Sequence, residues 1–272
     1  MNKIKVGFIG LGNMGSALAK AVARGGFDVI FYDQSIEKCN AVKSALEGEG
    51  LSAEVLSVSE LISRSDYIFL GVKPQGLDTI ANEIAPILRE NQGKIIVSML
   101  AGVKIAKLKE KLSAKIIRIM PNTPVGIGEG VVIWSAEGDI SDSDGETFEK
   151  MCEKCGVVDR LPEEQLDAVT AISGCGPAFV YMFIDALSKG GERAGIPREK
   201  ALLYGAQTLI GASKNLMASK QTPEDLKRAV CSPNGSTLKG VGSLEADGFE
   251  DIVIRAVLAS YKRTVELGQE NK

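Results

Sequence analysis

The 272-residue sequence contains no histidine, a single tryptophan and five cysteines. The absence of histidine excludes the residue most often used as a general acid or base, and it removes the commonest metal ligand. Five cysteines with no secretory leader are typical of a reducing compartment, in which they remain thiols. Cys152 and Cys155 form a CxxC pair, which lacks the four ligands of a structural zinc site. We interpret them as thiols near a helix end, with a redox pair as the alternative, and we predict no metal.

The sequence also lacks an excess of basic charge and a long apolar run. Lys and Arg total 32 against 35 Asp and Glu, a formal net charge of −3, whereas nucleic-acid-binding proteins normally carry a basic excess. No apolar stretch approaches the roughly 20 residues that span a bilayer. The strand-like run in "MNKIKVGFIG" leaves no room for a signal peptide. We therefore expect a cytoplasmic protein with no nucleic-acid or membrane partner.

Short β-rich runs alternate with helical patterns up to about residue 160. Such alternation indicates parallel βαβ units, so we predict an α/β fold whose residues 1–162 form a Rossmann-like doubly wound sheet. Strands are predicted over 4–10, 28–33, 66–72, 94–100, 115–122 and 130–135, and helices over 14–24, 36–47 and 76–89.

Helical stretches replace strands after Leu161 and Pro162, so residues 163–272 are predicted to form an all-α domain. The segment "PAFVYMFIDAL", residues 177–187, is apolar almost all round, and such a helix must be buried on every side. Because a small helical domain rarely encloses a helix completely, we predict that a second copy of the chain covers it, in a homodimer or a larger assembly.

The first predicted strand is followed by Gly10-x-Gly12-x-x-Gly15 and then by a helical pattern. This is the context that a dinucleotide-binding motif requires: Gly10 for a tight turn, Gly12 for close approach of the pyrophosphate and Gly15 for helix packing. We expect the free N–H groups of the helix N-terminus to bind the phosphates of a nicotinamide dinucleotide.

Asp33 ends the second predicted strand. An acidic side chain at this place accepts hydrogen bonds from the adenosine ribose hydroxyls and repels a 2′-phosphate. No arginine follows in "DQSIEK", and Lys38 lies further on, so the sequence favours NADH over NADPH. The alternative is that Asp33 caps the helix that begins at Ser35 or Ile36.

The chemistry must proceed without histidine. Carbonyl reduction normally needs a proton donor such as His, Lys or Tyr beside the hydride acceptor. An imine nitrogen is far more basic than a ketone oxygen and arrives protonated, so its reduction needs orientation more than an acid. In "CSPNGST" the N–H groups of residues 235–237 would receive a carboxylate, and the Thr237 hydroxyl would bond the ring nitrogen. The residues alone favour an ordinary helix cap here, in which Ser or Thr satisfies its own helix.

Five stretches resemble the Δ1-pyrroline-5-carboxylate reductases. They are "GFIGLGNMGSALAKA", "FLGVKP" at 69–74, "MPNTP" at 120–124, "DAVTAISGCGPAFVY" at 167–181 and "VCSPNGST" at 230–237. The resemblance implies reduction of L-1-pyrroline-5-carboxylate to L-proline with NADPH or NADH, the last step of proline biosynthesis. It also implies dimerisation by interlaced helical domains, with frequent further assembly, commonly to decamers.

The resemblance implies roles for individual positions as well. The cofactor would contact the glycine-rich loop, the segment after the third strand, the segment after the fourth strand and, near the nicotinamide, an asparagine: Ile9, Gly10, Leu11, Gly12, Asn13, Met14, Gly15, Gly71, Val72, Lys73, Pro74, Met99, Leu100, Ala101 and Asn122. The substrate would contact Glu163, Gly235, Ser236 and Thr237, with the threonine hydroxyl facing the imine nitrogen. Departures from the family pattern occur at Val58, Cys175, Ala229 and Asn234.

Two alternative functions remain at this point. A β-hydroxyacid dehydrogenase shares a Rossmann domain followed by helices but needs a catalytic lysine, for which Lys189 and Lys214 are the candidates. An NAD(H)-binding sensor would bind the cofactor without turnover.

Overall fold

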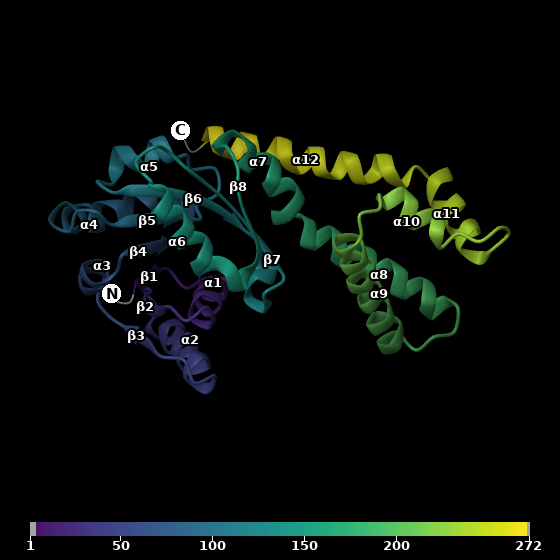
Figure 1. The fold of residues 1–272 in the computed structure, drawn as a ribbon, viewed down its shortest axis with the longest axis horizontal. Coiled ribbons are helices and arrows are strands. Elements are labelled where there is room, and N and C mark those ends of the chain that lie inside the picture. Colours follow the sequence, from purple (N-terminus) through teal and green to yellow (C-terminus); the bar gives the residue numbers. More distant parts are fainter. Residues whose placement is uncertain (1–3, 271–272) are drawn as a thin grey trace. The chain divides into compact units, whose positions relative to one another are not determined.

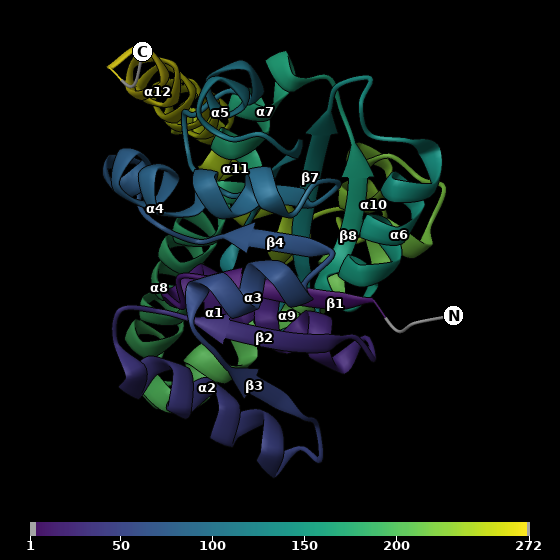
Figure 2. The same cartoon turned by 90° about the vertical axis from the view of Figure 1, so that its left-hand side faces the viewer.

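The structure, a computed structural model, describes residues 4–270 (Figures 1 and 2). Contacts divide the chain into two compact units. One comprises the residues up to Gly174 together with the end of the chain from Ser260, and the other comprises Cys175–Ala259. All described strands lie in the first unit, and the second is built from helices.

The first unit is built on an eight-stranded sheet in the order β3-β2-β1-β4-β5-β6-β7-β8. The strands are β1 (Lys5–Ile9), β2 (Asp28–Tyr32), β3 (Ala53–Val55), β4 (Tyr67–Leu70), β5 (Ile95–Ser98), β6 (Lys115–Pro121), β7 (Gly130–Ala136) and β8 (Gly156–Arg160). From β3 to β6 every neighbouring pair is parallel. The order reverses between β1 and β4, and in open α/β sheets such a switch point is where ligands bind.

The strand β7 runs antiparallel to β6. The two are joined by a short loop with one 3₁₀ turn, η2 (Thr123–Ile127), whereas a parallel pair needs a crossover of a dozen or more residues. A longer connection through α6 (Asp142–Cys152) and η3 (Glu153–Cys155) then brings β8 parallel to β7.

Helices cover both faces of the sheet. Because side chains alternate along a strand, Val6 and Phe8 of β1 pack into one core with α1 (Asn13–Arg24), α2 (Ile36–Gly48) and α6. Ile9 of the same strand packs into the other core with α3 (Val58–Arg64), α4 (Leu77–Glu90) and α5 (Ile105–Lys111). The two hydrophobic layers fix the sheet, and with it the loops at the carboxyl ends of its strands.

Four helix starts among the described residues are capped by a hydroxyl side chain. Ser35 caps α2, Ser57 caps α3 and Ser141 caps α6, each by accepting a hydrogen bond from a backbone N–H of the first turn. The helices α1 and α11 (Ser236–Ala246) instead begin after a glycine, Gly12 and Gly235, with no side-chain cap. Their first-turn N–H groups therefore lack a partner from a capping side chain.

A run of short helical turns follows β8 and belongs to the first unit. It consists of η4 (Glu163–Gln165), α7 (Leu166–Val169) and the π-helical turn η5 (Thr170–Gly174). The predicted domain boundary near residue 162 thus marks the end of the strands, whereas contacts divide the chain at Gly174. The Arg118 side chain of β6 and the side chain of Asn122, which follows the strand, hold this segment on the sheet.

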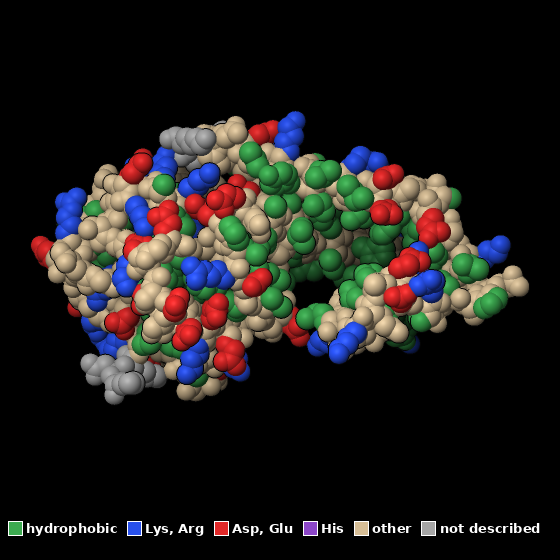
Figure 3. Space-filling view, turned by 45° about the horizontal axis from the view of Figure 1, so that its top comes forward, with side chains coloured by type: hydrophobic (Ala, Val, Ile, Leu, Met, Phe, Trp, Pro, Cys, Tyr) green, Lys and Arg blue, Asp and Glu red, His purple; other side chains and the backbone are tan. Residues whose placement is uncertain are grey.

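The second unit contains α8 (Gly176–Arg193), α9 (Arg198–Ala218), α10 (Pro223–Ala229), α11 and the first half of α12 (Phe249–Glu270). Apolar side chains gather on its surface (Figure 3). In α8, the segment predicted to be wholly buried, Tyr181 is 64% and Met182 is 72% exposed in the single chain. The helix therefore needs a cover that the chain itself does not provide.

The structure corrects two expectations about these elements. The helical run Glu163–Arg193 is long and apolar enough to cross a membrane by length and composition, so the expectation of no such segment is wrong; a helix that packs against another subunit has the same composition. The strands β3 and β8 were not predicted. The first has only three residues, and the second carries Asp159 and Arg160 at a half-exposed sheet edge.

Candidate functional site

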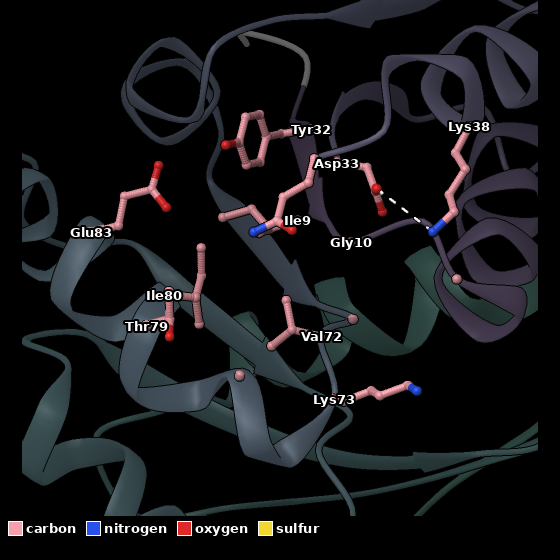
Figure 4. Close-up of a pocket in the computed structure, with 14 residues that line it drawn as sticks. Ile9, Gly10, Tyr32, Asp33, Lys38, Val72, Lys73, Thr79, Ile80 and Glu83 are labelled. Carbon is pink, nitrogen blue, oxygen red and sulfur yellow. Dashed lines mark ion pairs between the residues drawn. The ribbon is translucent and has the colours of Figure 1, made fainter.

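A cavity lies at the switch point of the sheet, beyond the carboxyl ends of β1, β2 and β4 (Figure 4). Its volume is about 390 Å³. Three loops, the first turn of α2 and the helix α4 line it, with Ile9, Gly10, Gly12, Tyr32, Asp33, Gln34, Lys38, Gly71, Val72, Lys73, Gly76, Thr79, Ile80 and Glu83.

Three glycines pack around one carbonyl group at the base of this cavity. Gly10 has φ +95°, which favours glycine, and a Cβ there would lie 2.8 Å from the carbonyl carbon of Gly71. A Cβ on Gly71 would lie 2.6 Å, and one on Gly15 2.2 Å, from the oxygen of Gly10. These contacts bring the β1 loop, the β4 loop and α1 together, and only glycine permits them.

Gly12 has a different role. A Cβ on Gly12 would meet nothing within 4 Å, and Gly12 borders the cavity. Gly12 is also the N-cap of α1 without a side-chain cap, so the N–H groups of the first turn of α1 are available to an anion. The pyrophosphate of a dinucleotide fits here, because the helix start is uncapped and the absence of a side chain on Gly12 leaves space beside it.

Asp33 holds the glycine-rich loop in place. Its Oδ2 accepts a hydrogen bond from the Leu11 N–H at 2.7 Å, and its Oδ1 accepts one from the Ser35 N–H at 2.9 Å. The alternative role as a helix cap is wrong, because Ser35 caps α2. Lys38 extends toward this carboxylate (Figure 4), with Nζ 3.8 Å from Oδ1.

Most of the predicted cofactor positions border this cavity or the space beside it. Ile9, Gly10, Gly12, Asp33, Gly71, Val72 and Lys73 line the first cavity. A second cavity of about 610 Å³ is lined by Leu11, Gly12, Asn13, Ser16, Ala17, Lys20, Arg24, Lys38, Gly126 and Ile127. The remaining predicted positions, which are Met14, Gly15, Pro74, Met99, Leu100, Ala101 and Asn122, line neither cavity.

Sequence reasoning missed the wall formed by α4. Thr79, Ile80 and Glu83 lie at helical spacing near the start of that helix and face the cavity. The sequence feature that could have indicated these residues is the position of the helix directly after "GVKP", since a helix that follows a switch-point loop borders the same crevice. Tyr32 lies opposite, and burial together with the nearby carboxylates of Glu83 and Asp33 raises the pKa of its hydroxyl.

Glu163 belongs to a buried ionic network. Arg118 of β6 is 1% exposed and donates to Glu163 and to Asp167, each at 3.1 Å. The same Glu163 oxygen accepts a hydrogen bond from the Ile105 N–H at 2.8 Å, at the start of α5. Glu163, predicted to contact the substrate, therefore also fixes the segment after β8 to the sheet.

Asn122 anchors the next part of that segment. The side chain is 7% exposed, its Nδ2 donates to the Ser173 carbonyl at 3.0 Å, and its Oδ1 accepts from the Val131 N–H at 2.8 Å. The amide thus holds η5 and the start of β7. A single-turn π-helix is frequent at functional sites, and here it directly precedes α8.

The turn before α11 is built around Asn234, the one non-glycine residue with positive φ (58°) among residues 4–270. A Cβ on Gly235 would lie 2.4 Å from the Ser232 hydroxyl and 3.0 Å from the Ser232 carbonyl oxygen, so a larger residue there would displace the Ser232 side chain. The Gly235 N–H donates to the Ser232 carbonyl at 2.9 Å, and this corrects the expectation that it is free. No side chain caps α11, so the alternative of an ordinary hydroxyl cap is wrong, and Ser236 and Thr237 are exposed.

Val58, one of the departures from the family pattern, has a structural role. It is 9% exposed and packs in a hydrophobic core.

Other residues singled out in the sequence lie away from the cavities. Cys152 and Cys155 are buried free thiols, and the hydrogen bond with Cys155 together with burial raises the pKa of Cys152. Lys189, a candidate for hydroxyacid chemistry, pairs with Asp185 on its own helix at 2.7 Å.

Comparisons with known proteins identify relatives of the whole chain. Residues 163–267 match the family model of pyrroline-5-carboxylate reductase dimerisation, and residues 5–102 match that of NADP oxidoreductase, coenzyme F420-dependent. Pyrroline-5-carboxylate reductase 2 of Pongo abelii is 39% identical over 271 residues, which cover 97% of this chain and 84% of that protein. The chain belongs to the pyrroline-5-carboxylate reductase family.

Further relatives extend this result. The pyrroline-5-carboxylate reductase of Arabidopsis thaliana is 37% identical over 97% of this chain and 96% of its own. The crystal structure of a Plasmodium falciparum pyrroline carboxylate reductase with NADP bound has a TM-score of 0.86 at 34% identity, covering 98% of this chain and 99% of that one. The predicted family, α/β fold with a helical dimerisation domain, and reductase activity with a nicotinamide cofactor are confirmed.

Substitution of Gly12 is expected to separate cofactor binding from folding. Gly12→Val fills space that is free of protein atoms, so thermal unfolding stays near that of the unmodified chain while affinity for NADH and NADPH falls by about tenfold or more. Gly15→Ala serves as the contrast, because its methyl group meets the Gly10 oxygen and lowers the unfolding temperature. Fluorescence titration and calorimetry measure the two effects; unchanged affinity in Gly12→Val would place the pyrophosphate elsewhere.

Proposed function

We propose that the chain reduces L-1-pyrroline-5-carboxylate to L-proline with NADH or NADPH, that the loop at Gly10–Gly15 binds the cofactor, and that the turn before α11 binds the substrate. Membership of the reductase family supports the reaction. The observation that carries the substrate site is the start of α11, which is exposed, begins after a glycine and has no capping side chain.

The substrate carboxylate fits this helix start. The N–H groups of Ser236 and Thr237 open an 11-residue helix without a hydroxyl or carboxylate cap, and such a start favours an anion through directed N–H groups and the helix dipole. Asn234 and Gly235 shape the turn that presents them.

The Thr237 hydroxyl is proposed to orient the ring nitrogen. It makes no hydrogen bond to another residue within 4–270, which leaves the oxygen available as an acceptor for the protonated imine. When bound, NAD(P)H supplies the hydride that reduces the C=N bond, and the nitrogen keeps the proton with which the protonated imine arrived. The chain needs no general acid at the reacting carbon, which agrees with the absence of histidine.

The reaction is tested by following nicotinamide oxidation with pyrroline-5-carboxylate, NADH and NADPH in parallel, with amino-acid analysis of the product. We expect stoichiometric proline, formed faster with NADH because the Asp33 carboxylate disfavours a 2′-phosphate. A faster reaction with NADPH would remove Asp33 from the cofactor preference and leave the reaction intact. Cofactor binding without proline from either cofactor would support a sensor instead.

Thr237→Ala is expected to lower kcat/KM for pyrroline-5-carboxylate by about tenfold to a hundredfold, the value of one hydrogen bond to a charged group. The dissociation constant of NADH should stay unchanged. Thr237→Ser keeps the hydroxyl and should retain most of the activity. Equal turnover in Thr237→Ala would exclude the hydroxyl from catalysis.

Glu163 is proposed to contact the substrate in addition to Arg118. Asp167 offers a matched control, because it pairs with the same guanidinium at the same distance of 3.1 Å. Glu163→Gln and Asp167→Asn should each lower the free energy of unfolding by about 1–3 kcal/mol. Only Glu163→Gln should also raise KM for pyrroline-5-carboxylate, by about tenfold. An equal KM in both variants would limit Glu163 to the ionic network.

The dimerisation family match indicates that the chain oligomerises. We propose a homodimer through the helical unit, with further assembly to a decamer, in the cytoplasm and without nucleic-acid or membrane partners. The exposed apolar side chains of α8, α9 and α12 support this assembly.

A further inference from the structure

The end of β2 carries a charge pair. Asp33 is a carboxylate whose two oxygens already accept backbone N–H groups, from Leu11 and from Ser35, and its side chain is only 12% exposed. Lys38 is 56% exposed and lies 3.8 Å from it. The Asp33 carboxylate is thus held by backbone N–H groups, whereas the Lys38 ammonium group is exposed to solvent.

Lys38 also has a distinctive position between the two cavities. It lines both of them, and the one other residue that does so is Gly12. The second cavity is lined by the cations Lys20, Arg24 and Lys38 and by no carboxylate. Arg24 is engaged by Glu49, to which it donates two hydrogen bonds of 2.7 Å. Lys38 is the cation that lies within 4 Å of the carboxylate at the end of β2.

Figure 4 shows Asp33 and Lys38 converging from the end of β2 and from the first turn of α2. A ribose bound beside Asp33 brings its 2′ substituent to this place. A hydroxyl there meets a carboxylate that is held by two N–H groups, and a phosphate there meets a flexible ammonium on the solvent side.

We propose that Lys38 determines the cofactor specificity of this chain: its ammonium group binds the 2′-phosphate of NADPH, so that the phosphorylated cofactor is accepted although β2 ends in Asp33. The inference rests on the proposed function and deepens it. Asp33 fixes the loop and disfavours the phosphate, Lys38 offsets that repulsion, and the balance of the two charges sets the ratio of affinities for NADPH and NADH.

Direct binding of two fragments tests the proposal without turnover. Adenosine 2′,5′-bisphosphate and adenosine 5′-monophosphate differ only in the 2′-phosphate, and calorimetric titration gives the affinity for each. We expect the unmodified chain to bind the bisphosphate no more tightly than the monophosphate, because Lys38 offsets the repulsion from Asp33 without exceeding it. Lys38→Met should weaken bisphosphate binding by about tenfold or more and leave the monophosphate unchanged, while Lys38→Arg, which keeps the charge, should retain the bisphosphate affinity.

Lys43 provides the control. It lies on the same helix, pairs with Glu47 at 3.7 Å and lines neither cavity, so Lys43→Met should bind both fragments as the unmodified chain does. Added salt should weaken bisphosphate binding by the unmodified chain more than by Lys38→Met.

Three outcomes would overturn the assignment. They are an equal loss of both fragments in Lys38→Met, an unchanged bisphosphate affinity in that variant, and a loss in Lys20→Met in its place, which would move the phosphate to the far side of the second cavity. Failure of the proposed function is distinct from these: a chain whose bisphosphate affinity depends on Lys38 but that forms no proline keeps the assignment and loses the reaction.

Discussion

The carbonyl group of Gly10 is the point around which the nucleotide-binding unit is organised. The loop after β1, the loop after β4 and the first turn of α1 all approach it so closely that a single added carbon on Gly15 or Gly71 would overlap its oxygen. Backbone packed directly on backbone leaves no side chain to adjust. The crevice at the switch point, the direction of α1 and the position of Asp33 against Leu11 therefore follow from one contact.

The two glycine-started helices connect fold and chemistry. Four other helix starts, those of α2, α3, α6 and α10, are capped by serine or threonine hydroxyls, as at Ser57 and Thr222. The starts at Gly12 and Gly235 have no such partners, and these are the two places at which we propose that the cofactor pyrophosphate and the substrate carboxylate bind. A glycine in place of a serine, threonine, asparagine or aspartate cap costs only about a few tenths of a kcal/mol, so these two helix starts remain open to an anion at little cost in stability.

Sequence reasoning reached the strands of the parallel sheet, the motif glycines and the family, because periodicity and glycine spacing are local signals. It did not reach β3 or β8, which are short or polar. It also missed the contacts that predicted site residues make within the protein. Asp33 accepts a hydrogen bond from the glycine-rich loop, Asn122 donates to η5 and Glu163 pairs with Arg118. Arg118 lies among isoleucines in β6, and no neighbouring residue indicates that its two carboxylate partners follow more than 40 residues later in the sequence.

The apolar surface of the helical unit makes the stability of the protein depend on its concentration. Side chains such as Tyr181, Met182 and Leu203 are more than half exposed in one chain, and water is a poor solvent for a surface of that kind. Where association covers such a surface, the free energy of unfolding rises with protein concentration by mass action. A newly made chain would then be most vulnerable to proteolysis and aggregation when copies are few, so synthesis rate becomes a determinant of how much folded enzyme survives.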